Sequence, residues 1–133
     1  KIGGVAKISD MGLAKNFRKA GYSGLTVTGI TVGSPPLIPR EQLLNFKYVK
    51  PVSDIWSIGA VLYHMLTGRI PYETKEGQSP IDVVFEGRII PIRERRVQIP
   101  RKLSRVVDKA LAVRPEDRFQ TASEFRDALL ESV

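Results

Sequence analysis

Four short groups of polar and charged residues follow one another along the chain, and each combines residue types that could do chemistry. They are Asp10-Met11-Gly12, then Gly33-Ser34-Pro35 with Pro39-Arg40-Glu41 shortly after it, then Asp54-Ile55-Trp56, and finally Arg114-Pro115-Glu116-Asp117-Arg118. The sequence contains no cysteine and a single histidine, His64. Disulfides and thiolate metal sites are therefore excluded. The ionisable and hydroxyl side chains within these four groups are carboxylates, guanidiniums and the Ser34 hydroxyl.

The third group opens the most regular stretch of the chain, residues 53–68. Its apolar residues recur at a helical period: Ile55, Ile58, Val61, Leu62, Met65 and Leu66. Ala60 widens this apolar stripe, so we expect a helix that is buried on more than one side. Ser53 or Asp54 is expected to cap its start, and Gly68 to end it in the left-handed conformation. Asp54 and Trp56 have a purely structural explanation that is as plausible as a functional one. An acid in the first turn is favoured by the helix dipole, and the tryptophan would belong to the core.

The elements around the first two groups have weaker signals in the sequence. Val5–Asp10 reads as a short strand, because apolar and polar residues alternate there. Residues 15–38 are rich in Gly, Ser, Thr and Pro and predict a long irregular region, which in a folded domain is usually functional or disordered. Pro39–Asn45 could form a short helix with proline at its first position.

The part of the chain from Ser79 onward predicts helices separated by loops. We expect a short helix from Ser79 to about Glu86, a loop from Gly87 to Pro100, an amphipathic helix from Arg101 to Val113, and a last helix that a capping box over Thr121–Glu124 opens. The last helix should bury Phe125, Ala128 and Leu129. The chain therefore predicts a mainly helical body with a single strand at its front.

Composition limits the function classes further. The chain has 133 residues, enough for one modest domain, and no apolar run approaches the length of a membrane span. It begins with Lys1, so we expect it to be a piece of a longer chain. The net charge is +7, but the basic residues read as dispersed, which favours a solvated surface over a nucleic-acid site. We expect no nucleic acid or membrane partner for this segment, and a cytoplasmic location.

Together and in this order, the four groups closely resemble the second half of a eukaryotic-type protein kinase domain. The run from Leu66 to Tyr72 and the short loops look more like the bacterial Ser/Thr kinases than like tyrosine kinases. The resemblance implies a mainly α fold, the lower part of a kinase C-lobe. Its helices would surround a buried central helix, with a short N-terminal β stub. Residues 1–133 would form one partial kinase domain.

The resemblance also implies catalytic roles. Asp10 matches the metal-binding Asp of the Asp-Phe-Gly motif, whose carboxylate holds Mg²⁺ on the ATP phosphates, so it is the expected catalytic, metal and cofactor-binding residue. Met11 replaces the usual Phe, and Gly12 would allow the backbone of the motif to flip. Ser34 matches the Thr or Ser that lies beside the substrate hydroxyl.

Residues 10–41 would be the activation segment. Within it, Thr28 and secondarily Thr26 lie at a spacing from Gly33 that is similar to that of the paired phosphorylated threonines of bacterial kinases. Phosphate there would add charge that arginines bind, ordering the loop. The alternative is that both threonines are ordinary polar loop residues.

The remaining matches imply structural roles. Glu41 matches the Glu of the Ala-Pro-Glu motif, although Pro39-Arg40 replaces its first two residues. Arg118 matches the arginine that pairs with this glutamate as a buried ion pair. Asp54, with Trp56 beside it, matches the Asp whose carboxylate accepts backbone N–H bonds from the catalytic loop.

Several kinase parts are missing from the sequence: the Gly-rich phosphate loop, the nucleotide-anchoring Lys, the catalytic Asp and the second metal-binding Asn. We therefore expect part of an ATP-dependent Ser/Thr kinase that is inactive by itself and binds neither ATP nor Mg²⁺ alone. The intact parent would use both and would act on Ser or Thr of protein substrates. The alternative is a non-catalytic, pseudokinase-like interaction module. Self-association is expected where the central helix lacks its covering segments.

Overall fold

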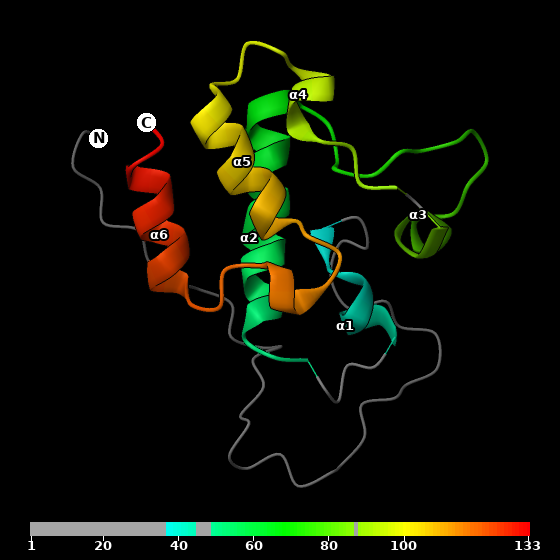
Figure 1. Cartoon of the computed structure of the whole chain (residues 1–133). Coiled ribbons are helices and arrows are strands. Elements are labelled where there is room, and N and C mark those ends of the chain that lie inside the picture. Colours follow the sequence, from blue (N-terminus) through cyan, green and yellow to red (C-terminus); the bar gives the residue numbers. More distant parts are fainter. Residues whose placement is uncertain (1–36, 45–48, 87) are drawn as a thin grey trace, which may run out of the picture. The chain divides into compact units, whose positions relative to one another are not determined.

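The computed structural model describes residues 37–44, 49–86 and 88–133, all of which fall within the unit Thr31–Val133. The elements in this part are α1 (Arg40–Leu44), α2 (Val52–Thr67), α3 (Pro80–Glu86), α4 (Ile92–Arg95), α5 (Arg101–Ala110), the 3-10 turn η4 (Pro115–Asp117) and α6 (Ala122–Leu130) (Figure 1). The β pairing among the described residues is one antiparallel bridge between Tyr72 and Ile89. The mainly helical fold class is thereby confirmed, and the expected strand at Val5–Asp10 lies outside the described residues.

Helix α2 is the element around which the others pack, and its bounds agree with the sequence to within a residue. Gly68 follows its last turn with φ of 70° and donates its N–H to the His64 carbonyl at 2.7 Å, as expected of a left-handed C-cap. The predicted cap at the other end is wrong. Pro51 occupies the N-cap without a side-chain hydrogen bond, and the Ser53 hydroxyl is used elsewhere.

The expectation that α2 is buried on more than one side is also wrong. Its buried residues are Val52, Ser53, Ile55, Trp56, Gly59, Ala60 and Tyr63. Ile58, Val61 and Met65, which belong to the apolar stripe read from the sequence, are 51%, 46% and 76% exposed. The buried face is therefore the one that carries the small and aromatic residues.

Close packing of α5 against α2 explains this orientation. A Cβ atom added to Gly59 would lie 2.9 Å from Ala110 Cβ, closer than real Cβ contacts come. Glycine at this position lets the two helices approach so closely that their small residues face each other. Ile55 and Ala110 then join Phe119 and Phe125 in a small core between α2, α5 and α6. The two phenylalanine rings stack at 5.3 Å between centroids.

The larger core lies on the other part of the same helix face. Trp56, Ala60 and Tyr63 of α2 meet Tyr72 and Ile92, together with residues of α3 and α5. Trp56 is 1% exposed and its ring lies 5.7 Å from that of Tyr72, at an interplanar angle of 34°. This core fixes the start of α2, where the candidate site is built.

The remaining helices begin largely where their capping residues predicted. Ser79 Oγ accepts the Asp82 N–H at 3.1 Å, and Thr121 Oγ1 accepts that of Glu124 at 3.1 Å. Glu124 returns a bond, accepting the Gln120 N–H at 2.9 Å. Two predictions were wrong: α5 ends at Ala110 rather than Val113, and the expected loop from Gly87 to Pro100 contains α4.

Candidate functional site

The candidate site is centred on an ion pair between α1 and the segment that follows η4. Arg118 Nη1 donates to Glu41 Oε1 at 2.6 Å, and Nη2 donates to Oε2 at 3.1 Å. The Arg118 side chain is 1% exposed and that of Glu41 28%. The two-point geometry is the one that a planar guanidinium makes with a carboxylate. This confirms the long-range pairing that the sequence predicted.

Every nitrogen of the Arg118 guanidinium has an acceptor. Nε donates to the Ala112 carbonyl at 2.7 Å, and Nη2 also donates to the Val113 carbonyl at 3.0 Å. On the other side, Glu41 Oε1 accepts the Ser53 hydroxyl at 2.9 Å. A buried charge is tolerated only when it is paired and hydrogen-bonded. This network therefore offsets the free-energy cost of burying the Arg118 charge. It connects α1, the start of α2 and the segment after α5.

The surroundings of Glu41 favour its charged form. Partial burial acts to raise the pKa of the Glu41 carboxyl, but hydrogen bonds and the positive charge from Arg118, with a further bond from Ser53, outweigh it. The pKa of Glu41 is therefore lowered from its ordinary value. The pair stays ionised at neutral pH.

Charged neighbours in sequence do not compete for this pair. Arg114 takes the local acids, with Nη2 at 2.6 Å from Glu116 and Nε at 4.0 Å from Asp117. Arg40 instead lies over the Phe85 ring, 5.8 Å from its centroid.

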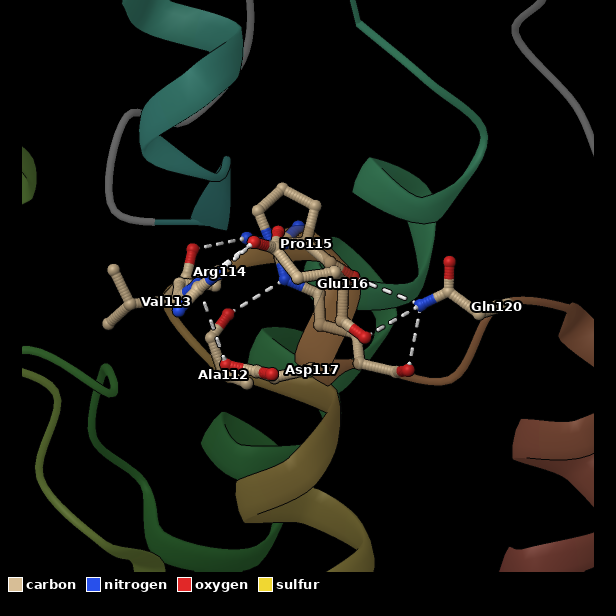
Figure 2. A network of polar contacts seen from close by, with 8 residues as sticks. Ala112, Val113, Arg114, Pro115, Glu116, Asp117 and Gln120 are labelled. Carbon is tan, nitrogen blue, oxygen red and sulfur yellow. Dashed lines mark hydrogen bonds and ion pairs between the residues drawn. The ribbon is translucent and has the colours of Figure 1, made fainter.

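The turn that carries Arg118 is held from a second direction. Figure 2 shows Gln120 reaching back to this turn, where its side-chain nitrogen donates to the carbonyls of Pro115 at 3.1 Å and Glu116 at 3.4 Å. The same nitrogen donates to the Arg118 carbonyl at 2.9 Å. The position of the buried guanidinium is thus fixed by its backbone as well as by its own bonds.

A hollow of about 300 Å³ adjoins the ion pair. It is lined by Arg40, Trp56, Tyr72, Val84, Phe85, Arg88, Ile89, Val113 and Arg118. Burial raises the pKa of the Tyr72 hydroxyl well above its usual range, so Tyr72 is neutral. The predicted structural residue Trp56 lies in the wall of this hollow, as part of the core.

Unlike Glu41, Trp56 and Arg118, Asp54 is exposed, in the first turn of α2. Its carboxylate makes no hydrogen bond or ion pair with another described residue. Its proposed role, accepting backbone N–H bonds from a catalytic loop, stays a prediction. His64, on the same helix, is exposed.

The residues expected to do chemistry, Asp10 and Ser34, lie outside the described residues, as do the phosphorylation candidates Thr26 and Thr28 and the predicted structural residue Gly12. Within the described ranges, no group of three or more His, Asp or Glu side chains could hold a metal ion. Nor does this part of the chain include a helix of the length and apolarity needed to cross a membrane.

The sequence analysis did not predict that the Ser53 hydroxyl donates a hydrogen bond to the Glu41 carboxylate. Ser53 was read as a helix cap, the commonest role of serine before an apolar helical run. Its position two residues after Pro51, which takes the cap, was the available signal. The Ala112 and Val113 carbonyls that hold Arg118 carry no side-chain signal at all.

Comparison with known proteins identifies the family to which this arrangement belongs. The family model described as protein kinase domain matches residues 2–129. The chain belongs to the protein kinase domain family. This confirms the resemblance drawn from the four residue groups.

Among kinase relatives, the chain is 40% identical over 111 residues to the Serine/threonine-protein kinase PknD of Chlamydia trachomatis serovar L2b, covering 81% of this chain and 11% of that protein. It is 33% identical over 126 residues to the Tyrosine-protein kinase MasK of Myxococcus xanthus, covering 95% of this chain and 19% of that protein. The chain thus spans about a tenth to a fifth of the length of these kinases.

Among solved structures, the kinase domain of Mycobacterium tuberculosis PknI matches with a TM-score of 0.51 and 25% identity. The match covers 71% of this chain and 34% of that one. The helical fold is therefore that of part of a protein kinase domain, its C-lobe.

Proposed function

We propose that this chain forms the substrate-side part of an ATP-dependent Ser/Thr protein kinase. The observation that carries the proposal is the Glu41–Arg118 ion pair, 2.6 Å at its shorter contact. It fixes the end of the proposed activation segment, residues 10–41, to the body of the C-lobe. In phosphoryl transfer most of the catalysis is positioning, so a fixed end of this segment is what a substrate platform requires.

The proposed chemistry is assigned to residues of that segment. Asp10 would hold Mg²⁺ through its carboxylate, a hard oxygen ligand that suits this ion, and Mg²⁺ neutralises charge on the ATP phosphates. Ser34 would lie beside the Ser or Thr hydroxyl of a protein substrate. The catalytic Asp and the nucleotide-anchoring Lys would come from residues that this sequence does not contain. We also propose a cytoplasmic location, because ATP is available there.

A chimaeric kinase tests this function. In it, residues 1–133 replace the matching segment of the PknD kinase domain, and transfer of labelled γ-phosphate to a generic protein substrate is measured. We expect transfer to Ser and Thr but not Tyr, and its loss in Asp10→Ala. The unchanged 133-residue chain should transfer no phosphate. Reading the genomic frame upstream of Lys1 for a His-Arg-Asp loop is an independent check.

The alternative, a non-catalytic interaction module, makes the opposite prediction. A chimaera that folds, as judged by a cooperative thermal melt, but transfers no phosphate would support the interaction module and contradict the kinase proposal. Activity that persists unchanged in Asp10→Ala would also contradict the assigned role of this carboxylate.

A further inference from the structure

Positive charge is concentrated in one stretch of the chain, residues 88–105. It contains seven of the 21 basic residues and one of the 14 acidic residues: Arg88, Arg93, Arg95, Arg96, Arg101, Lys102 and Arg105 against Glu94. The expectation that the basic residues are dispersed is therefore wrong here. Stretches of one sign attract partners of the opposite sign.

The structure gathers part of this charge around one hollow. A cavity of about 360 Å³ is lined by Arg93 of α4 and by Arg101, Ser104 and Arg105 of α5. The three α5 residues are spaced i, i+3 and i+4, so they share one face of the helix. Asp108 Oδ1 accepts the Ile92 N–H at 2.9 Å and holds α4 against α5. The helices that carry the cations on the two sides of the hollow are therefore held together, while the side chains of Arg101 and Arg105 are exposed.

The other arginines of this stretch already have partners. Arg88 pairs with Glu94 at 3.1 Å, while Arg95 and Arg96 donate to backbone carbonyls at 3.1 and 2.9 Å. In contrast, the three arginines of the hollow form no ion pair and donate no side-chain hydrogen bond to another described residue.

The two carboxylates nearest to the hollow in sequence have other partners, and Glu94 is paired with Arg88 at 3.1 Å. The first turn of α5 contains no acid, although acids are favoured at that end of a helix. Asp108, one turn beyond Arg105, is already engaged by the Ile92 N–H. Arg93, Arg101 and Arg105 line the same hollow, so their positive charges repel one another, and an anion bound in the hollow would offset that repulsion.

We propose that this hollow, the α4–α5 arginine hollow, binds a phosphorylated Ser or Thr side chain of a partner protein. A phosphoryl group has close to two negative charges and three acceptor oxygens, so several arginine forks can bond it at once. A carboxylate has a single charge and fewer acceptor sites. The cavity volume accommodates a side chain that enters from an extended segment.

The geometry favours a peptide over a nucleic acid or a membrane surface. The cations converge on one hollow instead of following a stripe, and its lining contains no aromatic side chain on which bases could stack. It also contains no large apolar residue of the kind that anchors a protein in a lipid interface.

Binding of a fluorescein-labelled peptide tests the proposal. The peptide contains one phosphoserine flanked by Gly and Ala, and its control contains unmodified Ser. Fluorescence anisotropy with the 133-residue chain should show saturable binding of the phosphorylated peptide only. We expect affinity to fall about tenfold in Arg105→Gln, and further in Arg93→Gln/Arg105→Gln, as loss of charge-assisted bonds predicts. Arg126→Gln removes an exposed arginine of α6 that pairs with Asp127 at 2.7 Å, and this variant should bind like the unchanged chain.

Two further measurements keep the result independent of folding defects. Arg105→Lys retains the charge but loses the fork, so its affinity should lie between those of the unchanged chain and Arg105→Gln. In the unchanged chain, the phosphopeptide should protect Arg93, Arg101 and Arg105 from phenylglyoxal modification, read by mass spectrometry.

Several outcomes would overturn the proposal. These are equal binding of both peptides, equal loss of affinity in Arg126→Gln, and protection of arginines elsewhere. Preferential binding of oligothymidylate or of phosphatidylserine vesicles through the same arginines would assign the hollow to a nucleic acid or a membrane instead. Displacement of the peptide by inorganic phosphate at equal concentration would indicate a site for the free ion.

Discussion

Glu41 and Arg118 are 77 residues apart in the sequence, yet their carboxylate and guanidinium meet at two points, 2.6 and 3.1 Å. The contact joins α1 to the segment after η4 and is shared with Ser53 at the start of α2. Three regions of the chain therefore depend on one buried guanidinium.

We expect Arg118→Ala to destabilise the fold by about 3–5 kcal/mol, because it leaves the half-buried Glu41 charge and two backbone carbonyls without their donor. Arg40→Ala, which removes an exposed arginine next to Glu41, should change stability little. Urea unfolding followed by circular dichroism measures both. Equal effects of the two substitutions would show that the pair contributes no more than a surface contact.

The same ion pair should make stability depend on acid pH. The pKa of Glu41 is lowered in the folded state, so its contribution is fully present above the ordinary value of 4.5 and is lost as pH falls through the lowered pKa. The stability difference between the unchanged chain and Glu41→Gln should therefore shrink below pH 4.5. Urea unfolding at pH 7 and across this acid range gives the difference directly.

Gly59→Ala should destabilise the packing of α5 on α2. The new methyl would approach Ala110 Cβ to 2.9 Å, and overpacking of a core costs about 1–3 kcal/mol. Replacing a helical glycine returns about 1 kcal/mol, so we expect a net loss of up to about 2 kcal/mol. Ala110→Gly in the same chain makes room and should recover part of this loss. Additive effects in that double-mutant cycle would mean that the helices adjust without strain.

Self-association is expected through the exposed face of α2. Ile58, Val61 and Met65 are spaced i, i+3 and i+7, so they form one apolar surface on this helix. Ile58→Lys/Met65→Lys should increase the monomer fraction in light scattering at matched concentration. Thr74→Lys, at an exposed position in the loop between α2 and α3, is the control. A monodisperse monomer for the unchanged chain would remove the prediction.

Thr28, with Thr26 second, is expected to be the regulatory phosphorylation site, because a new phosphate can order a loop by binding arginines. Mass spectrometry of the chimaeric kinase after incubation with ATP should find phosphate at Thr28 first. Thr28→Ala should lower transfer to substrate several-fold, while Thr31→Ala, in the same segment, should not. An active protein modified at neither Thr26 nor Thr28 would contradict this.

The sequence predicted elements whose signals are local. Gly68, Ser79 and Thr121 each mark a helix end through a single residue's chemistry, and each was found at that end. The order of the four residue groups identified the family, and through it the Glu41–Arg118 pair. The helix ends and the ion pair were predicted correctly because neither prediction depends on how the helices are rotated against one another.

Features that depend on tertiary packing could not be predicted from the sequence. The close contact of Gly59 with Ala110 decides which face of α2 is buried. The period of the large apolar residues, from which that face was predicted, does not include glycine. Helix α4 is one turn long and starts at an N–H whose acceptor, Asp108, lies 16 residues later. The same contact brings Arg93 to the hollow that Arg101 and Arg105 line, so this arrangement could not be predicted from the sequence either.

The bonds of Arg118 also imply an order of events during folding. Its bonds to Ala112 and Val113 span six and five residues, whereas those to Glu41 span 77. Short loops close at lower entropic cost and faster than long ones, so the guanidinium can be oriented by its local carbonyls before α1 arrives. Docking of Glu41 then belongs to the late side of the folding barrier. Loss of that carboxylate would shorten the lifetime of the folded chain more than it would slow its formation.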